Sequence, residues 1–318
     1  MAQIDLVQVR PQTRSLDLRR ILAKLSRFWP LYVMLVPGII YYLVFRYWPI
    51  YGLTIAFKNF RVLEGIDGSP WVGFANFQVL FDSPLFIRAL RNTVVISALK
   101  LFIGFPMPII LALMLNEVRN KGVKRVIQTI SYLPHFLSWV IIYALLLALF
   151  SPARGLVNQA IIDMGGGAIN FLTDPRWFVG VIVGSDIWKE IGWGAIIYLA
   201  ALTSISPELY EAASIDGASR WQMVRFISLP GILPVILLMF ILRMGTILDA
   251  GFDQIYILYN PLVYETTDII DTWVFRNGIE EFRFALSTAA SVFKSVFGLG
   301  LLLGANQLAR RFSGQGIW

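Results

Sequence analysis

Six charged side chains interrupt the long apolar stretches of this sequence, where a charge is costly unless it has a partner or a function. They are Lys100, Asp186, Lys189, Glu190, Arg243 and Lys294. Charges at such depth usually face the interior of a helix bundle or a water-filled cavity. The group is therefore predicted to line a path for a polar solute.

The balance of these charges predicts the charge of that solute. Asp186 and Glu190 lie one helical turn apart and flank Lys189. Four bases against two acids leave two positive charges in excess, before Arg46 is counted. A cavity with this excess favours an anionic substrate, because opposite charges attract most strongly where water is scarce.

A purely structural interpretation of the same charges is the alternative. In it, Lys189 and Arg243 neutralise the two acids within the helix bundle. Lys294 or Lys100 then extends its long side chain to the membrane surface or pairs with a second subunit.

Residues for catalysis, metal binding or cofactor binding are not recognisable in the sequence. It contains no cysteine, and its one histidine, His135, cannot form a site of several histidines. A phosphate-binding loop is absent, since Lys294-Ser295 follows Phe293 and not glycine. Neither G-x-S-x-G nor H-E-x-x-H occurs. We therefore predict a chain that is not an enzyme, holds no metal or cofactor, and takes its energy from a partner or an ion gradient.

Length and composition predict an integral membrane protein built of helices. The chain has 318 residues, of which 57% are hydrophobic and 15% charged, and its mean hydropathy is +0.67. A membrane span takes about 20 apolar residues. Six segments reach this length and are predicted at Leu31–Phe57, Ala89–Leu115, Val126–Phe150, Trp177–Ser204, Gly231–Leu248 and Ala285–Ala309. The first run is long and lacks a cleavage site, so we expect a retained span and not a signal peptide.

Lysine and arginine are unevenly distributed among the connections, which predicts the orientation of the chain in the membrane. The basic regions are the N-terminal segment, the link after the second span and the C-terminus. They carry Arg10, Arg14, Arg19, Arg20, Lys24, Arg27, Arg119, Lys121, Lys124, Arg125, Arg310 and Arg311. The connection before the last span is acidic and contains Asp249, Asp253, Glu265, Asp268, Asp271, Glu280 and Glu281. Both termini and the connection around Glu211 are thus predicted to be cytoplasmic.

The connection before the fifth span has the spacing E-A-A-x3-G-x9-I-x-L-P, which starts at Glu211. Ser206-Pro207-Glu208 is typical of a helix start, and Gly217 can end that helix in a left-handed conformation. A second short helix is predicted over Ser219–Ile227, and Leu229-Pro230 is expected to turn the chain back into the membrane. The result is an elbow on the inner surface that a partner protein can approach closely. An amphipathic loop without a partner is the alternative.

This spacing resembles the signature loop of the permease subunits of bacterial binding-protein-dependent ATP-driven importers, the ABC importers. The resemblance implies that the elbow docks into a cleft of an ATP-binding subunit. The motif assigns docking to Glu211, Ala212, Ala213 and Gly217, and the exit from the elbow to Ile227, Leu229 and Pro230. The resemblance also implies a type I importer fold, a second permease subunit, two ATP-binding subunits that hold ATP and Mg, and a periplasmic solute-binding protein. Membrane lipid surrounds such a chain, and no nucleic acid is involved.

Two further stretches narrow the resemblance. Tyr47–Lys58 ends the first span, and Gly251–Thr272 lies in the last outer connection. Both are similar to the permeases of oligo- and polysaccharide importers, among them the first permease subunit of an alginate importer. An anionic, alginate-like polysaccharide suits the predicted excess of positive charge.

The expected protein is an all-α, multi-pass permease of the bacterial inner membrane that works by alternating access. We predict a cytoplasmic segment over residues 1–30, a six-helix transmembrane domain over 31–309 with the elbow at 205–230, and a cytoplasmic tail over 310–318. A neutral oligosaccharide or another solute is an alternative substrate. An ion-coupled secondary transporter is the alternative from another class, although broken helices at matching positions in two halves are not visible.

Overall fold

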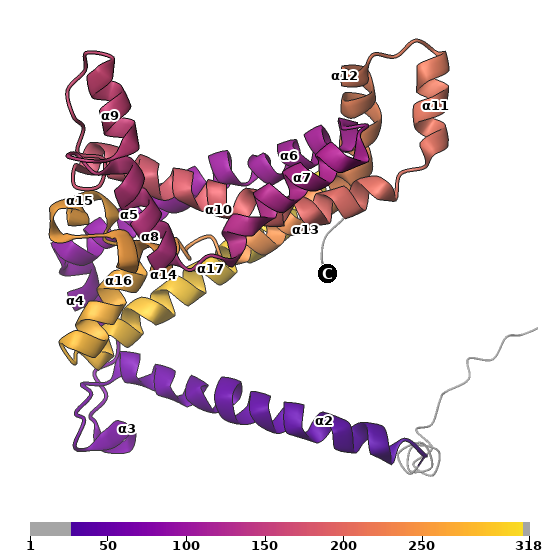
Figure 1. The fold of residues 1–318 in the computed structure, drawn as a ribbon. Coiled ribbons are helices and arrows are strands. Elements are labelled where there is room, and N and C mark those ends of the chain that lie inside the picture. The colour runs from indigo at the N-terminus through magenta and orange to yellow at the C-terminus, as the bar shows by residue number, and fades with distance from the viewer. Residues whose placement is uncertain (1–26, 314–318) are drawn as a thin grey trace, which may run out of the picture. The chain divides into compact units, whose positions relative to one another are not determined.

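The computed structural model describes residues 27–313, which are helical almost throughout (Figure 1). Within this range no β-strand forms, and extended segments meet only in the isolated bridges Lys58–Trp71 and Arg61–Gly65. The described residues divide into two units, 27–54 and 55–313. The basic residues predicted at the N-terminus before Arg27 lie outside the described residues.

The first unit is an apolar helix that changes its winding near its end. It comprises α2 (Trp29–Tyr42), the π-helical turn η1 (Leu43–Tyr47) and the 3-10 helix η2 (Trp48–Phe57), whose last residues belong to the second unit. Pro49 has no amide hydrogen to donate, and the change of winding lets the helix continue past it. The predicted segment Leu31–Phe57 is confirmed as part of a helix long and apolar enough to cross a membrane.

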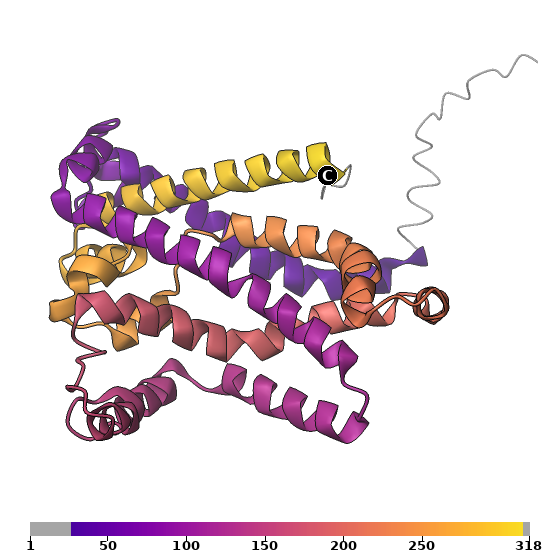
Figure 2. The same cartoon turned by 90° about the horizontal axis from the view of Figure 1, so that it is seen from above.

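The second unit contains the remaining helices. In chain order they are α3 (Gly65–Gly68), α4 (Ala75–Asp82), α5 (Pro84–Leu99), η3 (Lys100–Gly104), α6 (Pro106–Glu117), α7 (Lys121–Tyr132), η4 (Leu133–Phe136), α8 (Trp139–Phe150), α9 (Leu156–Asp163), α10 (Pro175–Thr203), α11 (Pro207–Ile215), α12 (Arg220–Met223), η5 (Val224–Ser228), α13 (Leu229–Gly245), α14 (Phe252–Leu258), η6 (Pro261–Val263), α15 (Tyr264–Thr267), α16 (Ile270–Phe275), η7 (Arg276–Glu280) and α17 (Phe284–Ser313). The turn η3 joins α5 to α6, and η5 joins α12 to α13, so that both sets form longer helices. α6 packs against α10, and Figure 2 shows α13 and α17 side by side.

Four helices of the described chain are long and apolar enough to cross a membrane, or five if one bent pair counts as a single span. The four are Trp29–Phe57, Pro84–Glu117, Arg220–Gly245 and Phe284–Arg311. They match the first, second, fifth and sixth predicted segments. The fourth predicted segment matches α10, an unbroken helix of 29 residues that carries several charges. The number of six spans stays a prediction.

The predicted third span, Val126–Phe150, is not one straight helix. It is bent by 109° between Lys121–Phe136 and Trp139–Phe150. Pro134 lies in the 3-10 turn η4 and has no amide hydrogen for a regular helix. The Ser138 hydroxyl then accepts a hydrogen bond from the backbone of α8 and begins that helix. The apolar sequence thus continues without a break, but Pro134 ends one helix within it and Ser138 begins the next.

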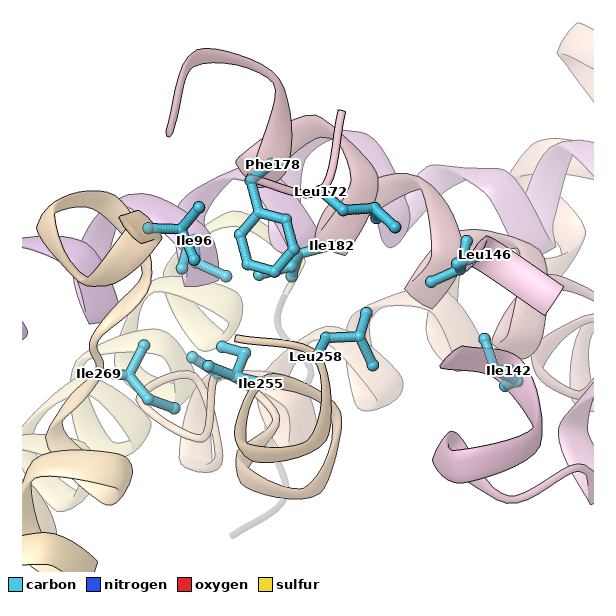
Figure 3. Close-up of a cluster of buried hydrophobic side chains, with 11 residues drawn as sticks. Ile96, Ile142, Leu146, Leu172, Phe178, Ile182, Ile255, Leu258 and Ile269 are labelled. Atoms are coloured by element: carbon cyan, nitrogen blue, oxygen red, sulfur yellow. The ribbon is translucent and has the colours of Figure 1, made fainter. Parts of the chain in front are cut away.

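The largest buried cluster of the described chain joins α5, α8, α10 and α14 (Figure 3). In Figure 3, Phe178 and Ile182 of α10 point toward Ile255 and Leu258 of α14. α14 belongs to the stretch predicted as the last outer connection. This connection is therefore not a solvated loop, because it folds back and buries its apolar side chains against the long helices.

Close packing of α7 on α10 depends on Gly192. A Cβ atom added there would overlap the carbonyl oxygen of Ser131 in α7, whereas one at Gly180 on the same helix would meet open space. Alanine favours a helix over glycine by about 1 kcal/mol, but overpacking costs about 1–3 kcal/mol. Gly192→Ala is therefore expected to lower the Tm of the purified protein, and Gly180→Ala to leave it unchanged or raise it. Equal Tm values for the two variants would contradict this packing argument.

Candidate functional site

Several charged residues of the predicted path surround an open cavity of about 770 Å³ in the second unit, the central cavity. Residues of α6, α10 and α13 form its walls, together with the segment that follows α13. Aromatic side chains line it on several sides, namely Phe105, Trp139, Trp193, Tyr198 and Phe252. Its ionisable side chains include Lys100, Asp186, Glu190, Arg243, Asp249 and Asp253. A volume and a mixed lining of this kind are typical of a site for a small polar molecule.

Lys100 is a fully paired charge at the wall of the central cavity. Its ammonium nitrogen lies 2.9 Å from an Asp186 carboxylate oxygen, 2.9 Å from the Ala250 carbonyl oxygen and 2.6 Å from the Gln254 side-chain oxygen. The residue is only 3% exposed. Since an ammonium group has three N–H donors, these three acceptors occupy it. Lys100 therefore joins η3 to α10 and to the segment after α13, and it has no donor left for a solute.

The Lys100 ammonium group also lies close to the backbone at Gly251. Gly251 has a φ of +98°, a left-handed conformation that favours glycine. A Cβ atom there would lie 2.9 Å from the Lys100 nitrogen, so a side chain is excluded for a second reason. Gln254 donates hydrogen bonds to the Ile182 carbonyl and the Ser185 hydroxyl, at 2.7 and 3.0 Å. The start of α14 is thus held against α10.

Lys189 does not line the central cavity. Its ammonium group donates hydrogen bonds to the backbone carbonyls of His135 and Leu137, the latter at 2.8 Å. Carbonyl groups at the end of a helix carry a partial negative charge and lack partners within the helix. Lys189 supplies these partners, and so stabilises the bend between α7 and α8.

Glu190 pairs with the single histidine of the chain. A Glu190 carboxylate oxygen lies 2.9 Å from Nδ1 of His135. The imidazole ring stacks on the ring of Trp193, with the centroids 4.5 Å apart. The bend therefore brings His135 from η4 to α10, where it holds Glu190 and Trp193 in place at the wall of the cavity.

Arg243 and Lys294 lie in two different places. Arg243, in the last turn of α13, lines the central cavity and forms no ion pair within the described residues. The Lys294 nitrogen lies 2.6 and 2.7 Å from the two Asp271 carboxylate oxygens, in a separate cavity beside α16 and α17. Burial raises the pKa of the Asp271 carboxyl, although Lys294 acts in the opposite direction. Only one of the four predicted bases, Arg243, is thus free to meet a solute in the central cavity.

The central cavity has an excess of carboxylates, and the predicted excess of bases is wrong for it. Four acidic side chains line it, against the two bases Lys100 and Arg243. Lys189 and Lys294 are held elsewhere. The predicted neutralisation of Asp186 and Glu190 by Lys189 and Arg243 is also wrong, because their partners are Lys100 and His135.

The sequence prediction missed two acidic residues of the cavity, Asp249 and Asp253. Both were counted in the acidic outer connection, whereas the structure places them at the cavity wall. The available signal was their position on either side of Gly251, soon after an apolar helix, because glycine can adopt the left-handed conformation of a turn. The structure has this conformation at Gly251.

The predicted elbow consists of α11 and α12, which Figure 1 shows as two legs joined by a turn. The Ser206 hydroxyl accepts a hydrogen bond from the Glu208 amide at the start of α11. Gly217 follows the helix with a φ of +76°. Ser219 and Gln222 form a capping box at the start of α12. The predicted helix start and the left-handed glycine are therefore confirmed.

The elbow exposes more apolar surface than a solvated turn requires. Ile215, at the end of α11, is 87% exposed, and Leu209, Trp221 and Phe226 are exposed as well. Glu211, Ala212 and Gly217 are also exposed, whereas Ala213 is half-buried. Apolar groups gathered on a polar surface mark a site for a partner.

Two side-chain contacts tie the elbow to the long helices. The Arg220 guanidinium lies 2.9 Å from a Glu117 carboxylate oxygen at the end of α6, beside a groove of about 860 Å³. The Tyr210 and Ser228 hydroxyls lie 2.9 Å apart and join α11 to η5. These contacts therefore connect the elbow to α6 and to the helix that continues into α13.

The exit from the elbow differs from the prediction. Ile227, Leu229 and Pro230 lie within one continuous helix, Arg220–Gly245, so Leu229-Pro230 does not turn the chain. The π-helical turn η5 ends at Ser228, two residues before this proline, and changes the hydrogen-bond pattern close to the point where the proline has no amide hydrogen to donate. The predicted second helix is therefore the first part of a long helix that carries the elbow into the bundle.

Residues 104–314 match the profile of a family described as binding-protein-dependent transport system inner membrane component. This match spans α6 to α17, and with them the elbow and most of the central cavity. The chain belongs to this family. The resemblance inferred from the E-A-A spacing is confirmed, and this inner membrane component is a subunit of a transport system and not an enzyme.

Known proteins resemble this inner membrane component over nearly its whole length. The polygalacturonan/rhamnogalacturonan transport system permease protein YteP of Bacillus subtilis (strain 168) is 45% identical over 94% of each chain. Protein LplB of the same organism is 44% identical over 93% of each chain. A crystal structure of a bacterial ABC transporter involved in the import of the acidic polysaccharide alginate contains a chain 46% identical, with a TM-score of 0.87, and the match covers 92% of this chain and 99% of that one.

A second structure extends the comparison. It is a bacterial alginate ABC transporter in complex with an alginate pentasaccharide-bound periplasmic protein. One of its chains is 45% identical to this inner membrane component, with a TM-score of 0.87, and the match covers 94% of this chain and all of that one. The helical arrangement described above is therefore the permease fold of these transporters.

Proposed function

We propose that this chain is one of two permease subunits of an ATP-driven importer that carries oligosaccharides across the bacterial inner membrane. The proposal is carried by the 45% identity to the permease protein YteP together with the TM-score of 0.87 to a chain of the alginate importer. Both of these proteins are named for the transport of polysaccharides. The lactose transport system permease protein LacF of Rhizobium radiobacter, 36% identical over 58% of this chain, supports sugars as the wider class of solute.

The proposed topology has six spans and two cytoplasmic termini. α10 and the bent pair formed by α7 and α8 add two spans to the four apolar helices. The basic residues at the start of α7 and the end of α17 then lie on the cytoplasmic side, as is usual for membrane proteins. Residues 1–30 and 310–318 become cytoplasmic segments, and 31–309 the transmembrane domain with the elbow at 205–230.

In the proposed mechanism the elbow is the part of this chain that the ATP-binding subunits move. An ATP-binding subunit, which holds ATP and Mg, docks on the exposed side of α11, with Glu211 and Ala212 at the contact and Ile215 as its apolar anchor. When two such subunits close, the elbow moves, and the pair of Arg220 with Glu117 transmits the movement to α6. The central cavity then opens alternately to a solute-binding protein outside and to the cytoplasm.

The central cavity supplies groups that recognise sugars. Aromatic rings such as Trp193 pack against the C–H faces of a sugar ring, and carboxylates accept hydrogen bonds from its hydroxyl groups. Arg243 offers a guanidinium group to the carboxylate of an acidic sugar. The names of the relatives favour an acidic oligosaccharide. The excess of carboxylates favours a second candidate, a neutral oligosaccharide, because like charges repel.

Uptake into proteoliposomes tests the proposed function. The chain is purified together with the subunits that copurify from its host membrane, and is reconstituted with a sugar-binding protein outside and ATP inside. Uptake of a labelled oligosaccharide is expected only when the sugar-binding protein and ATP are both present. Uptake that needs an ion gradient and no ATP would overturn the proposal in favour of a secondary transporter.

Arg243→Met separates the two substrate candidates. Loss of a charge-assisted contact is expected to slow the uptake of trigalacturonate about tenfold, equivalent to about 1.4 kcal/mol, and to change that of the neutral maltotriose less than about twofold. Arg154→Met, at an exposed position outside the cavity, is the matched control. Equal slowing of both sugars would show that Arg243 supports the structure and does not recognise a carboxylate.

A further inference from the structure

A second cavity, of about 560 Å³, lies next to the central cavity and is called the side cavity. Its walls come from α16, η7 and α17, which do not contribute to the central cavity. Asp249 and Phe252 line both cavities. The two spaces therefore share a wall at the segment after α13.

Polar groups with unused bonding capacity gather in the side cavity. Lys294 donates to both oxygens of Asp271, at 2.6 and 2.7 Å, which leaves one N–H of the ammonium group and further lone pairs of the carboxylate available. Ser287 is 5% exposed and lines the same cavity. Its hydroxyl has no hydrogen-bond partner within residues 27–313. A buried hydroxyl without a partner is unfavourable, and a bound molecule that hydrogen-bonds to it removes this cost.

Apolar side chains form another part of the lining. The rings of Phe252 and Phe275 lie with their centroids 5.6 Å apart, and Phe284 lines the same cavity. An uncharged sugar ring has apolar C–H faces that suit aromatic side chains and a rim of hydroxyls that suits Lys294, Asp271 and Ser287. The carboxylates of Asp249 and Asp271 outnumber the single ammonium group, so an acidic ring is disfavoured.

We propose that the side cavity binds an uncharged ring of an oligosaccharide whose other rings occupy the central cavity, through Lys294, Asp271 and Ser287. The inference rests on the proposed function, because it needs an oligosaccharide as the solute. A disaccharide is held by the central cavity alone. A longer oligosaccharide extends past Asp249 and Phe252 and gains the contacts of the side cavity. The permease thus prefers longer oligosaccharides that contain uncharged rings.

Filling the side cavity tests this inference. The probes are oligosaccharides of two and of four rings prepared from rhamnogalacturonan, in which acidic and uncharged rings alternate. Ser291→Phe places a bulky ring in the side cavity, and Val296→Phe is the control on the exposed side of the same helix. In the proteoliposome assay, Ser291→Phe is expected to slow uptake of the longer probe about tenfold and that of the shorter probe less than about twofold.

Removal of one hydroxyl provides a second test that does not fill the side cavity. Ser287→Ala is expected to raise the apparent KM for the longer probe about threefold, while Ser295→Ala, which removes an exposed hydroxyl from the same helix, leaves it unchanged. If the Ser291→Phe variant does not assemble, the comparison of Ser287→Ala with Ser295→Ala tests whether the side cavity binds a sugar ring. Equal effects on both probes, or no effect of Ser287→Ala on either, would overturn the side-cavity inference alone. Absence of ATP-dependent uptake by the unmodified transporter would overturn the proposed function, and the inference with it.

Discussion

Lys100→Met is expected to lower the stability of the purified transporter by about 3 kcal/mol, the lower part of the usual cost of removing one partner from a buried ion pair. The substitution leaves Asp186 without its counter-charge, and deprives the Ala250 carbonyl and the Gln254 side chain of their donor. Asp186 keeps a side-chain exposure of 23% toward the cavity, so water can compensate part of the loss. The segment that holds α14 against α10 should loosen first, because it loses the hydrogen bonds of Lys100 to Ala250 and Gln254.

The Tm and the yield of the purified protein measure this effect. Lys121→Met, at an exposed lysine at the start of α7, is the matched control and should leave the Tm unchanged. The double variant Lys100→Met/Asp186→Asn should recover part of the lost stability, because it leaves no uncompensated charge. The same Tm for Lys100→Met as for the control would show that the group around Lys100 does not stabilise the fold.

Ile215→Asp is expected to weaken the docking of the ATP-binding subunit by at least about 2 kcal/mol, which is about 30-fold in Kd, and to stop ATP-driven uptake. Ile215 is the large apolar side chain at the end of α11 and is 87% exposed in this chain. Such a side chain contributes to binding because it moves from water into an apolar pocket of the partner. A carboxylate in its place would have to be buried without a partner. Since Ile215 has little contact with its own chain, folding should not change.

Copurification of the ATP-binding subunit in detergent measures the docking, and the Tm of the permease reports on its folding. Leu63→Asp is the matched control, because Leu63 is an exposed apolar residue of the second unit outside the elbow. The Leu63→Asp variant should copurify with the ATP-binding subunit as the unmodified chain does. Normal copurification and uptake with Ile215→Asp would place the docking surface elsewhere.

Features that depend on neighbouring residues were predictable from the amino-acid sequence. The start of α11 at Ser206, its end before the left-handed Gly217, and the apolar helices of the first, second, fifth and sixth segments were all predictable. The E-A-A spacing was enough to identify the family, because the motif is local and covers a single elbow. Such signals need only one or two helical turns of chain, in which the residues that interact are near one another in sequence.

The pairing of the charged residues, by contrast, follows from the packing of distant helices. Lys100 pairs with Asp186, 86 residues away, and with Gln254, 154 residues away, whereas Lys189 bonds to the carbonyls of a bend that apolar length did not predict. A count of charges along the sequence therefore predicted the wrong charge balance for the central cavity. A residue's depth within a helix can be counted from sequence, but the direction of its side chain and the segment it faces follow from how distant helices pack. That packing also brings Asp249 and Asp253 into the cavity, since the chain after α13 buries its apolar side chains by folding back on α10.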